Sequence, residues 1–166
     1  MTLTQSAPPA RLAVPPFQVL LDRHRDDVYR FLTAIVGRDL ADDCFQETFL
    51  SALRAYDRID DASNLRSWLL TIAHRKAIDA VRARARRPLV VADVPEGHAR
   101  DQDEPADEAL WTLVRELPPR QRAAVAHRFV NDLAYREIGR VMGCSPEAAR
   151  RSVHEGLTRL RKDWSP

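Results

Sequence analysis

The sequence has few of the residues on which disulfide frameworks, metal sites and catalytic centres depend. Its two cysteines, Cys44 and Cys144, are 100 positions apart, and neither belongs to a CxxC or Cys/His cluster. This spacing supports no zinc or redox motif, and two lone cysteines fit a reducing compartment. There is no Ser/His/Asp or Cys/His arrangement and no phosphate-cradling glycine loop. An enzyme is therefore the least favoured class, and we expect neither a metal nor a cofactor.

Long apolar runs are also missing, and none approaches the length needed to span a bilayer. The opening stretch, MTLTQSAPPARLAVPPF, is broken by prolines and has no continuous apolar core. It therefore does not resemble a signal peptide. We expect a soluble, cytoplasmic protein with no membrane insertion.

Glycine and aromatic residues are scarce, at five glycines and 7% aromatics in 166 residues, while Ala, Leu and Arg are frequent. This composition favours helix. Net charge is only +2, but the charges are segregated. Residues 71–87 carry six Lys/Arg against one Asp, residues 88–109 carry one Arg against seven acids, and residues 110–166 carry eleven Lys/Arg against six acids. Such segregation usually concerns binding partners rather than the fold.

Apolar spacing and helix start and stop signals predict an all-α protein with no β-strand of any length. We expect a disordered tail (1–16), a first domain (17–87), a flexible acidic linker (88–106) and a second domain (107–166). The Pro-rich, acidic composition of the linker has no periodicity. The expected helices span about 17–36, 39–56, 65–87, 107–116, 118–130, 134–142 and 146–162.

The last two expected helices have the layout of a DNA-reading helix-turn-helix. Gly143 suits the left-handed position after a helix end, Ser145 suits an N-cap, and Pro146 suits the first helical position. In such a motif the first residues of the second helix approach base edges in the major groove. Here these are Pro146, Glu147, Ala148, Arg150 and Arg151, and the candidates for phosphate contacts are Arg120, Arg122, Arg136 and Arg140. A helical hairpin with a solvated basic face remains the alternative.

An acidic helix face is predicted within residues 39–49. Its polar members lie adjacent or one helical turn apart, while Phe45 and Phe49 lie on the buried face. The polar members are Asp42, Asp43, Gln46 and Glu47. A plain solvated face is the simplest interpretation, and metal or acid–base chemistry is disfavoured because no His lies at ligand spacing.

Basic and aromatic residues are combined in the helix expected from Asn64. An isolated Trp usually belongs to a core, and a lone His is usually structural. The combination suits single-stranded nucleic acid, in which phosphates and flipped bases are held together. The residues are Arg66, Trp68, His74, Arg75, Lys76 and Arg82.

Three segments, in this order, resemble a bacterial RNA polymerase sigma factor of the extracytoplasmic-function (ECF) type: DLADDCFQETFLSALRAY, LRSWLLTIAHRKAIDAVRAR and LPPRQRAAVAHRFVNDLAYREIGRVMGCSPEAARRSVHEGLTRLR. The resemblance covers nearly the whole chain outside the tail and linker. It implies two helical domains. The first binds the clamp of the polymerase beta-prime subunit and captures the melted minus-ten strand, and the second reads the minus-thirty-five duplex of promoter DNA.

The resemblance also implies roles for individual residues. Polymerase binding falls to Asp42, Asp43, Gln46 and Glu47. Within the loop 58–65, Asn64 receives a flipped minus-ten base. The strand-binding helix contributes Arg66, Trp68, Arg75, Lys76, Asp79 and Arg82, and the minus-thirty-five helix contributes Glu147, Ala148, Arg150, Arg151 and His154. The linker is expected to pass through the polymerase active-site cleft, and an anti-sigma factor is an expected partner.

Several positions depart from the family pattern. Leu65 stands where an aromatic is frequent, and Ala134 stands where a Ser cap is common. On the last helix, Ala149, Ser152 and Gly156 replace the usual Val, Arg and Ala, and the glycine alone weakens a helix by about 1 kcal/mol. These changes leave the duplex sequence and the strength of the minus-thirty-five contact open. The alternative function is a stand-alone helix-turn-helix repressor or activator that acts as a dimer.

Overall fold

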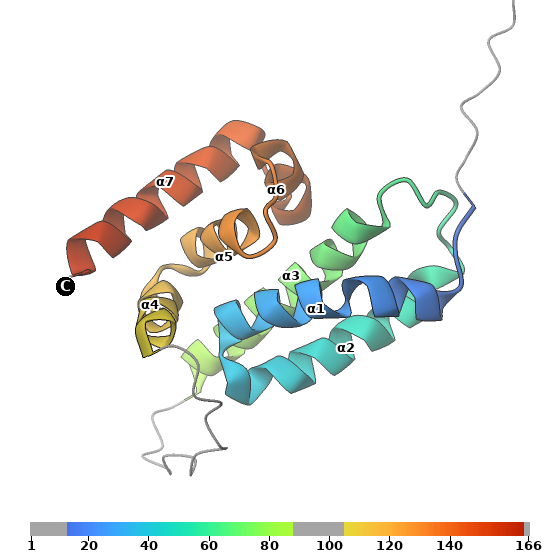
Figure 1. Ribbon diagram of the computed structural model, residues 1–166, viewed down its shortest axis with the longest axis horizontal. Helices are drawn as coiled ribbons and strands as arrows, with labels where there is room; N and C mark the ends of the chain where they lie inside the picture. The colour runs from blue at the N-terminus through green and yellow to red at the C-terminus, as the bar shows by residue number, and fades with distance from the viewer. Residues whose placement is uncertain (1–12, 88–104, 165–166) are drawn as a thin grey trace, which may run out of the picture.

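The computed structural model describes residues 13–87 and 105–164, and these residues form seven helices and no strand (Figure 1). The all-helical class is therefore confirmed. The helices are α1 (Phe17–Val36), α2 (Arg38–Tyr56), α3 (Leu65–Arg86), α4 (Pro105–Glu116), α5 (Pro119–Phe129), α6 (Tyr135–Met142) and α7 (Pro146–Asp163). None of these helices is long and apolar enough to cross a membrane.

The first three helices pack on one another as an N-terminal half (Figure 1). Gly37 ends α1 as the sequence predicted, and its φ of 82° lies where glycine is favoured. Helix α2 begins one residue earlier than expected, with Gly37 at its N-cap and no side-chain cap hydrogen bond. The Asp39 carboxylate lies in the first turn and forms an ion pair with Arg84 of α3.

The start of α3 has no side-chain cap. Asn64 occupies the N-cap position, but neither it nor Ser63 caps the helix with a side-chain hydrogen bond. Ser63 turns back instead, and its Oγ donates to Asp61 Oδ2 at 2.7 Å. The Asn64 amide is thus left exposed at the tip of the loop.

The predicted tail and linker lie mostly outside the described residues. At the end of the tail, Val14 packs against the core, and the carbonyl of Pro15 accepts a hydrogen bond from the Tyr56 hydroxyl. Contact with the N-terminal half therefore begins before the expected boundary at Pro16. At the end of the linker, α4 begins at Pro105, two residues earlier than expected.

Helices α4 to α7 form the C-terminal half, and its closing hairpin has the predicted turn. Gly143 adopts the left-handed conformation (φ 66°, ψ 40°), and the Ser145 hydroxyl accepts from the Ala148 N–H at 3.1 Å. Ala134 lies at the N-cap of α6 but has no side-chain group that could cap the helix. Its N–H donates to the carboxylate of Glu137 at 3.0 Å.

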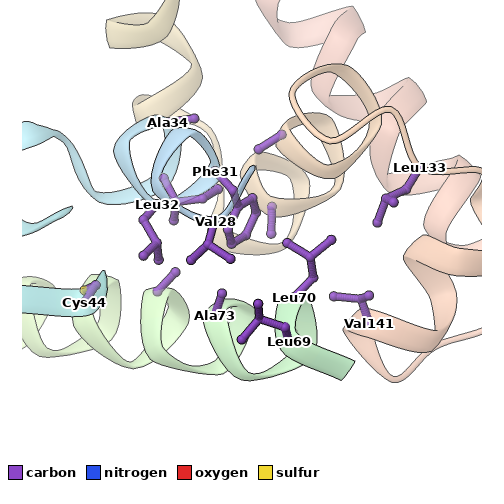
Figure 2. Packing of buried hydrophobic residues seen from close by; sticks show 14 of the residues in the cluster. Val28, Phe31, Leu32, Ala34, Cys44, Leu69, Leu70, Ala73, Leu133 and Val141 are labelled. Carbon is purple, nitrogen blue, oxygen red and sulfur yellow. The ribbon is translucent and has the colours of Figure 1, made fainter. Parts of the chain in front are cut away.

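One hydrophobic core extends across both halves of the molecule, a contact that the sequence did not predict. The buried cluster of α1, α2 and α3 continues without a break into residues of α5, α6 and the turn between them (Figure 2). Leu133 and Val141 reach from the C-terminal half toward the cluster that contains Leu70 (Figure 2). A second, smaller cluster belongs to the C-terminal half alone and contains Val114, Leu117, Val125 and Leu160.

His127 of α5 is fully buried where the two halves meet. Its ring stacks on Phe31 of α1, with centroids 4.1 Å apart and planes 15° apart. His127 Nε2 lies 3.3 Å from His74 Nδ1 of α3, and its Nδ1 lies 3.3 Å from the amide nitrogen of Asn131. Since that amide donates to Nδ1, Nε2 of His127 carries the proton and donates to His74. The imidazole of His127 is then neutral, with a partner for each of its nitrogens.

The pKa of each histidine is lowered mainly by burial. For His74, burial with added repulsion from Arg75 and Arg82 lowers the pKa to about 4. For His127, burial followed by His74 and Arg66 lowers the pKa well below its ordinary value of 6.5. Protonation of either ring therefore opposes the packing of the two halves.

Gly156 allows α7 to approach α5 closely. A Cβ at this position would lie 2.8 Å from Val125 Cγ2 and 3.5 Å from Leu117 Cδ1. Ala149 and Ser152 are buried on the same side of α7. The departures from the family pattern at these three positions therefore concern packing within the C-terminal half, and their side chains do not belong to the exposed face of the helix.

We predict that Gly156→Ala destabilises the protein although alanine favours helix. Overpacking against Val125 costs about 1–3 kcal/mol, and the gain in helix propensity offsets only about 1 kcal/mol. Chemical denaturation checks the net loss. Gly143→Asn is the control, because asparagine tolerates the left-handed conformation and nothing lies within 4 Å of a Cβ there. An increase in stability for Gly156→Ala contradicts the packing argument.

We also predict that acid weakens the folded state through the histidine pair. A His whose folded pKa is lowered binds fewer protons than in the unfolded chain, so its contribution is complete above pH 6.5 and is lost progressively below it. With the His74 pKa near 4, this residue alone removes about 1 kcal/mol between pH 7.5 and 5.5. The free energy of unfolding of His74→Gln, which keeps an acceptor for His127, should fall by about 1 kcal/mol less over this interval. Equal losses in both proteins contradict the assignment.

Candidate functional site

The acidic face of α2 is exposed as the sequence predicted. Asp42, Asp43, Gln46 and Glu47 all lie on the surface of this helix. Asp42 Oδ1 accepts from the Tyr29 hydroxyl at 3.0 Å, and Glu47 lies 3.8 Å from Lys76 Nζ of α3. Two residues of the quartet are thus held by neighbouring helices. The described residues contain no group of three or more His, Cys, Asp or Glu that could hold a metal ion.

Two exposed leucines extend this face, and the sequence analysis missed them. Leu50 and Leu53 are 52% and 51% exposed, and they lie seven residues after Asp43 and Gln46 respectively. Seven residues are nearly two helical turns, so the leucines lie on the same side of α2 as the acidic residues. Helical spacing from Gln46 is the sequence signal that places Leu53 on this face. Acidic residues beside exposed leucines suit a protein partner.

A groove borders the acidic face where α1 meets α2. It has a volume of about 600 Å³ and is lined by Arg25, Asp26, Tyr29, Arg30, Asp42 and Phe45. Tyr29 is 38% exposed, and its ring packs edge-on against Phe45 with centroids 5.8 Å apart. Burial, followed by its hydrogen bond to Asp42, raises the pKa of Tyr29. The tyrosine therefore stays a neutral donor beside the acidic face.

Helix α3 presents its basic residues on an exposed face. Arg75, Asp79 and Arg82 are exposed and follow one another at helical spacing, while Lys76 is half-buried beside Glu47. Trp68 is half-buried, with its ring 6.3 Å from that of Tyr56. The exposed face carries the predicted charges, and Trp68 contributes partly to the core.

Arg66 lies where the two halves touch and is already engaged. Its Nε donates to Asp27 Oδ2 of α1 at 3.1 Å, and its Nη2 donates to the carbonyl of Asn131 at 2.8 Å. The side chain remains 36% exposed. Arg66, one of the predicted strand-binding residues, is thus hydrogen-bonded to the C-terminal half.

A cavity of about 230 Å³ lies beside Asn64. The loop residues Ala62 and Ser63 line it together with Arg23 and His24 of α1. Burial lowers the pKa of His24, partly offset by Asp27, so its ring can accept or donate as a neutral group. No sequence pattern indicates Arg23 and His24, because only the packing of α1 against the loop brings them to Asn64.

The predicted base-reading residues lie at the N-terminal end of α7, next to the turn from α6. Ala148 is half-buried, and the others are exposed on the first turns of the helix: Pro146, Glu147, Arg150, Arg151 and His154. Arg136 is exposed on α6, the first helix of the same motif. The hairpin therefore presents one basic, largely unobstructed face to solvent.

Arg122 does not join that face. Its guanidinium donates twice to the carbonyl of Leu117, at 3.3 and 3.2 Å, and once to the carbonyl of Ile35 at 3.1 Å. Burial, with repulsion from Arg115 and Arg84, lowers its pKa. The structure therefore uses this arginine to tie the start of α5 to the end of α1.

Two family patterns match the chain, one over each half. The pattern described as Sigma-70 region 2 covers residues 20–87, and the pattern described as Sigma-70, region 4 covers residues 107–160. The first corresponds to α1–α3 and the second to α4–α7.

Curated relatives agree with these patterns. The chain is 34% identical over 152 residues to the RNA polymerase sigma factor CarQ of Myxococcus xanthus, covering 88% of this chain and 87% of that relative. It is 28% identical over 159 residues to the ECF RNA polymerase sigma factor SigX of Bacillus subtilis, covering 88% and 82%.

Solved structures share the fold. The sigma factor RpoE in complex with the anti-sigma factor NepR from Bartonella quintana superposes with a TM-score of 0.74 at 21% identity, covering 90% of this chain and 96% of that one. CnrH, solved with the cytosolic domain of CnrY, gives a TM-score of 0.66 at 20% identity, covering 88% and 85%.

The position of Arg122 leads to a prediction about stability. Arg122→Met keeps the aliphatic stem and leaves two part-buried carbonyls without their donor, so it should cost about 1–3 kcal/mol of unfolding free energy. Arg120→Met is the matched control, since Arg120 is exposed and its loss should change stability by less than about 0.5 kcal/mol. Chemical denaturation of both variants checks this. Equal effects show that the carbonyl contacts do not hold α5 to α1.

Proposed function

The chain belongs to the ECF family of RNA polymerase sigma factors, and from this we propose which of its surfaces performs each part of promoter recognition. Members of this family direct RNA polymerase to promoters and catalyse no reaction. The same holds for this chain. Membership also sets aside the alternative of a stand-alone dimeric repressor. One observation supports separate surfaces for polymerase and for duplex DNA. An acidic surface with exposed leucines lies on α2, and a separate basic surface lies on α7.

The acidic face of α2 binds the clamp of the polymerase beta-prime subunit. Asp42, Asp43, Gln46 and Glu47 supply its polar contacts, and Leu50 and Leu53 supply apolar area. Protein interfaces bury apolar anchors within a polar rim, and this face offers both. The groove beside Tyr29 extends the same surface.

The exposed face of α3 and the cavity beside Asn64 capture the melted minus-ten strand. A base turned out of the stack enters the cavity, where Asn64 and His24 offer donors and acceptors to its edge. Arg66, Arg75, Lys76 and Arg82 bind phosphates, and Trp68 and Asp79 complete this face. Because the pocket takes only an unpaired base, binding favours the open strand over the duplex, and melting is stabilised by that difference in affinity.

The first turns of α7 read the minus-thirty-five duplex. Arg150 and Arg151 can pair with guanine, Glu147 can accept from cytosine, and small Ala148 lets the helix approach the groove. Pro146 and His154 border this surface, and Arg136 of α6 binds phosphate. Arg122 acts in packing, where its donors are already occupied.

Three further assignments follow from family membership. The two halves act as separate domains joined by a linker that enters the polymerase active-site cleft. The protein is cytoplasmic, where polymerase and promoter are found. An anti-sigma factor restrains it, a proposal supported by the two similar structures solved with NepR and with CnrY.

Two double variants should separate the two surfaces. Arg150→Ala/Arg151→Ala should lower affinity for the cognate promoter at least about tenfold, because each bidentate base contact contributes about 1–3 kcal/mol, and should leave polymerase binding unchanged. Asp43→Ala/Gln46→Ala should weaken polymerase binding about tenfold by removing charge-assisted and polar contacts. Fluorescence anisotropy measures both affinities, and reconstituted transcription measures their consequence.

Matched controls lie on the same elements or have the same residue types. Arg159→Ala/Arg161→Ala removes the same charge from the far end of α7, and Gln18→Ala/Asp22→Ala removes the same side-chain types from exposed positions of α1. Both controls should behave like the wild type. If the two test variants share one defect profile, the division between α2 and α7 is wrong.

A further inference from the structure

The cavity beside Asn64 is bounded by two segments that are far apart in the sequence. One side is formed by residues 62–66, where the loop meets α3. The other side is formed by the chain that enters α1: Pro15, Val19, Leu20, Arg23 and His24. The segment before α1 and the loop between α2 and α3 lie side by side at one end of the N-terminal half (Figure 1). The space inside the cavity therefore depends on how the segment before α1 is held.

The segment that carries Pro15 has few polar groups through which it can be held. Neither Pro15 nor Pro16 has a backbone N–H, so the backbone of each offers only a carbonyl. The Pro16 carbonyl is used within α1, where it accepts from the N–H of Val19 at 2.9 Å. Pro16 is extended (φ −54°, ψ 144°), and the two proline rings make the segment stiff. One hydrogen bond to the Pro15 carbonyl, with the packing of Val14 against the core, can therefore fix the segment.

That bond comes from Tyr56, the last residue of α2, whose hydroxyl donates to the Pro15 carbonyl. The Tyr56 side chain is buried, and its ring packs edge-on against Phe17 with centroids 5.1 Å apart. Burial raises the pKa of Tyr56, so its hydroxyl remains a protonated donor at neutral pH. Its backbone carbonyl accepts from the N–H of Ile59 at 3.1 Å, at the start of the loop that leads to Asn64. Tyr56 thus contacts both segments that bound the cavity.

We propose that Tyr56 is a positioning residue for capture of the minus-ten strand, because it holds Pro15 in place as a wall of the cavity. Tyr56 is not among the residues that line the cavity, and it acts on the base through Pro15. Without the hydroxyl, the wall can move away from the cavity. The unpaired base then loses contacts, while the phosphate contacts on α3 are unchanged. The inference rests on the proposed function, since it takes this cavity as the site of the unpaired base.

Binding of two oligonucleotides to the complex of polymerase with the full chain tests this role. The first is the single-stranded minus-ten element of a promoter selected by transcription from a randomised library. The second carries an abasic site at the position where such a site weakens wild-type binding most.

Tyr56→Phe keeps the ring and removes only the hydroxyl. It should lower the affinity for the intact strand about two- to fivefold and leave the affinity for the abasic strand unchanged. One hydrogen bond changes the ratio of held to displaced wall about fivefold, and apparent affinity scales with the fraction of molecules in which the wall is held. Fluorescence anisotropy measures both affinities.

A matched control and a second variant accompany this measurement. Tyr135→Phe removes the same group from α6 and keeps the ring that Arg128 contacts, so it should bind both strands as the wild type does. Pro15→Gly removes the proline ring and loosens the segment, so it should reduce the preference for the intact strand as Tyr56→Phe does. In the double variant the two losses should not add, because both act through the same wall.

The possible results are distinct. An equal loss of affinity for both strands in Tyr56→Phe overturns the positioning role, because a purely structural defect does not depend on the base. Additive losses in the double variant overturn the action through Pro15. If no abasic position weakens binding by the wild type, the cavity does not receive a base, and the proposed function of this site fails together with the inference. If the wild type prefers the intact strand and Tyr56→Phe retains the full preference, only this inference is wrong.

Discussion

The buried imidazole of His127 is the constraint on which the arrangement of the two halves depends. A fully buried ring must be neutral and must have partners for both nitrogens, since an unpaired buried polar group is costly. One partner, Asn131, comes from its own half, but the other, His74, comes from α3. The stack on Phe31 fixes the ring against α1 as well. Satisfying one side chain thus sets the position of α5 relative to two helices of the other half.

Small residues on α7, the proposed DNA-reading helix, fix its position relative to α5. Gly156 brings α7 against Val125 of α5, and Ala149 and Ser152 are buried along the same side. A close approach of this kind leaves little freedom for sliding, because a packed interface responds to changes of a single methyl group. Uncharged residues on the buried side of α7 consequently set the orientation of its charged face. The substitutions at these positions act on the packing of α7, and the side chains that we propose to contact bases lie on the other, exposed side of the helix.

Local signals account for what the sequence predicted. Gly37, Gly143 and Ser145 act within one or two turns of the chain, and the helix limits and the turn of the hairpin followed from them. The acidic and basic faces also followed, because helical spacing alone places their members together. The packing of the C-terminal half on the N-terminal half did not follow from local signals. It joins α1 and α3 to residues about 50 to 100 positions away in the sequence. Residue roles that depend on packing between distant segments were missed for the same reason. Examples are the hydrogen bonds of Arg122 to backbone carbonyls and the placement of His24 beside Asn64.

The surface where the two halves meet is built from apolar side chains of modest size. Its apolar members from the C-terminal half are small or medium in size, such as Ala123, Ala126, Leu133 and Val141. Fully burying a Val or Leu side chain contributes about 1.5–3 kcal/mol at most, and part of that area stays covered by each half after separation. The histidine pair adds directional bonds that water can replace once the halves part. A contact of this size can order a small chain, because the shared apolar core fixes the spacing of the halves and the bonds of His127 fix their register.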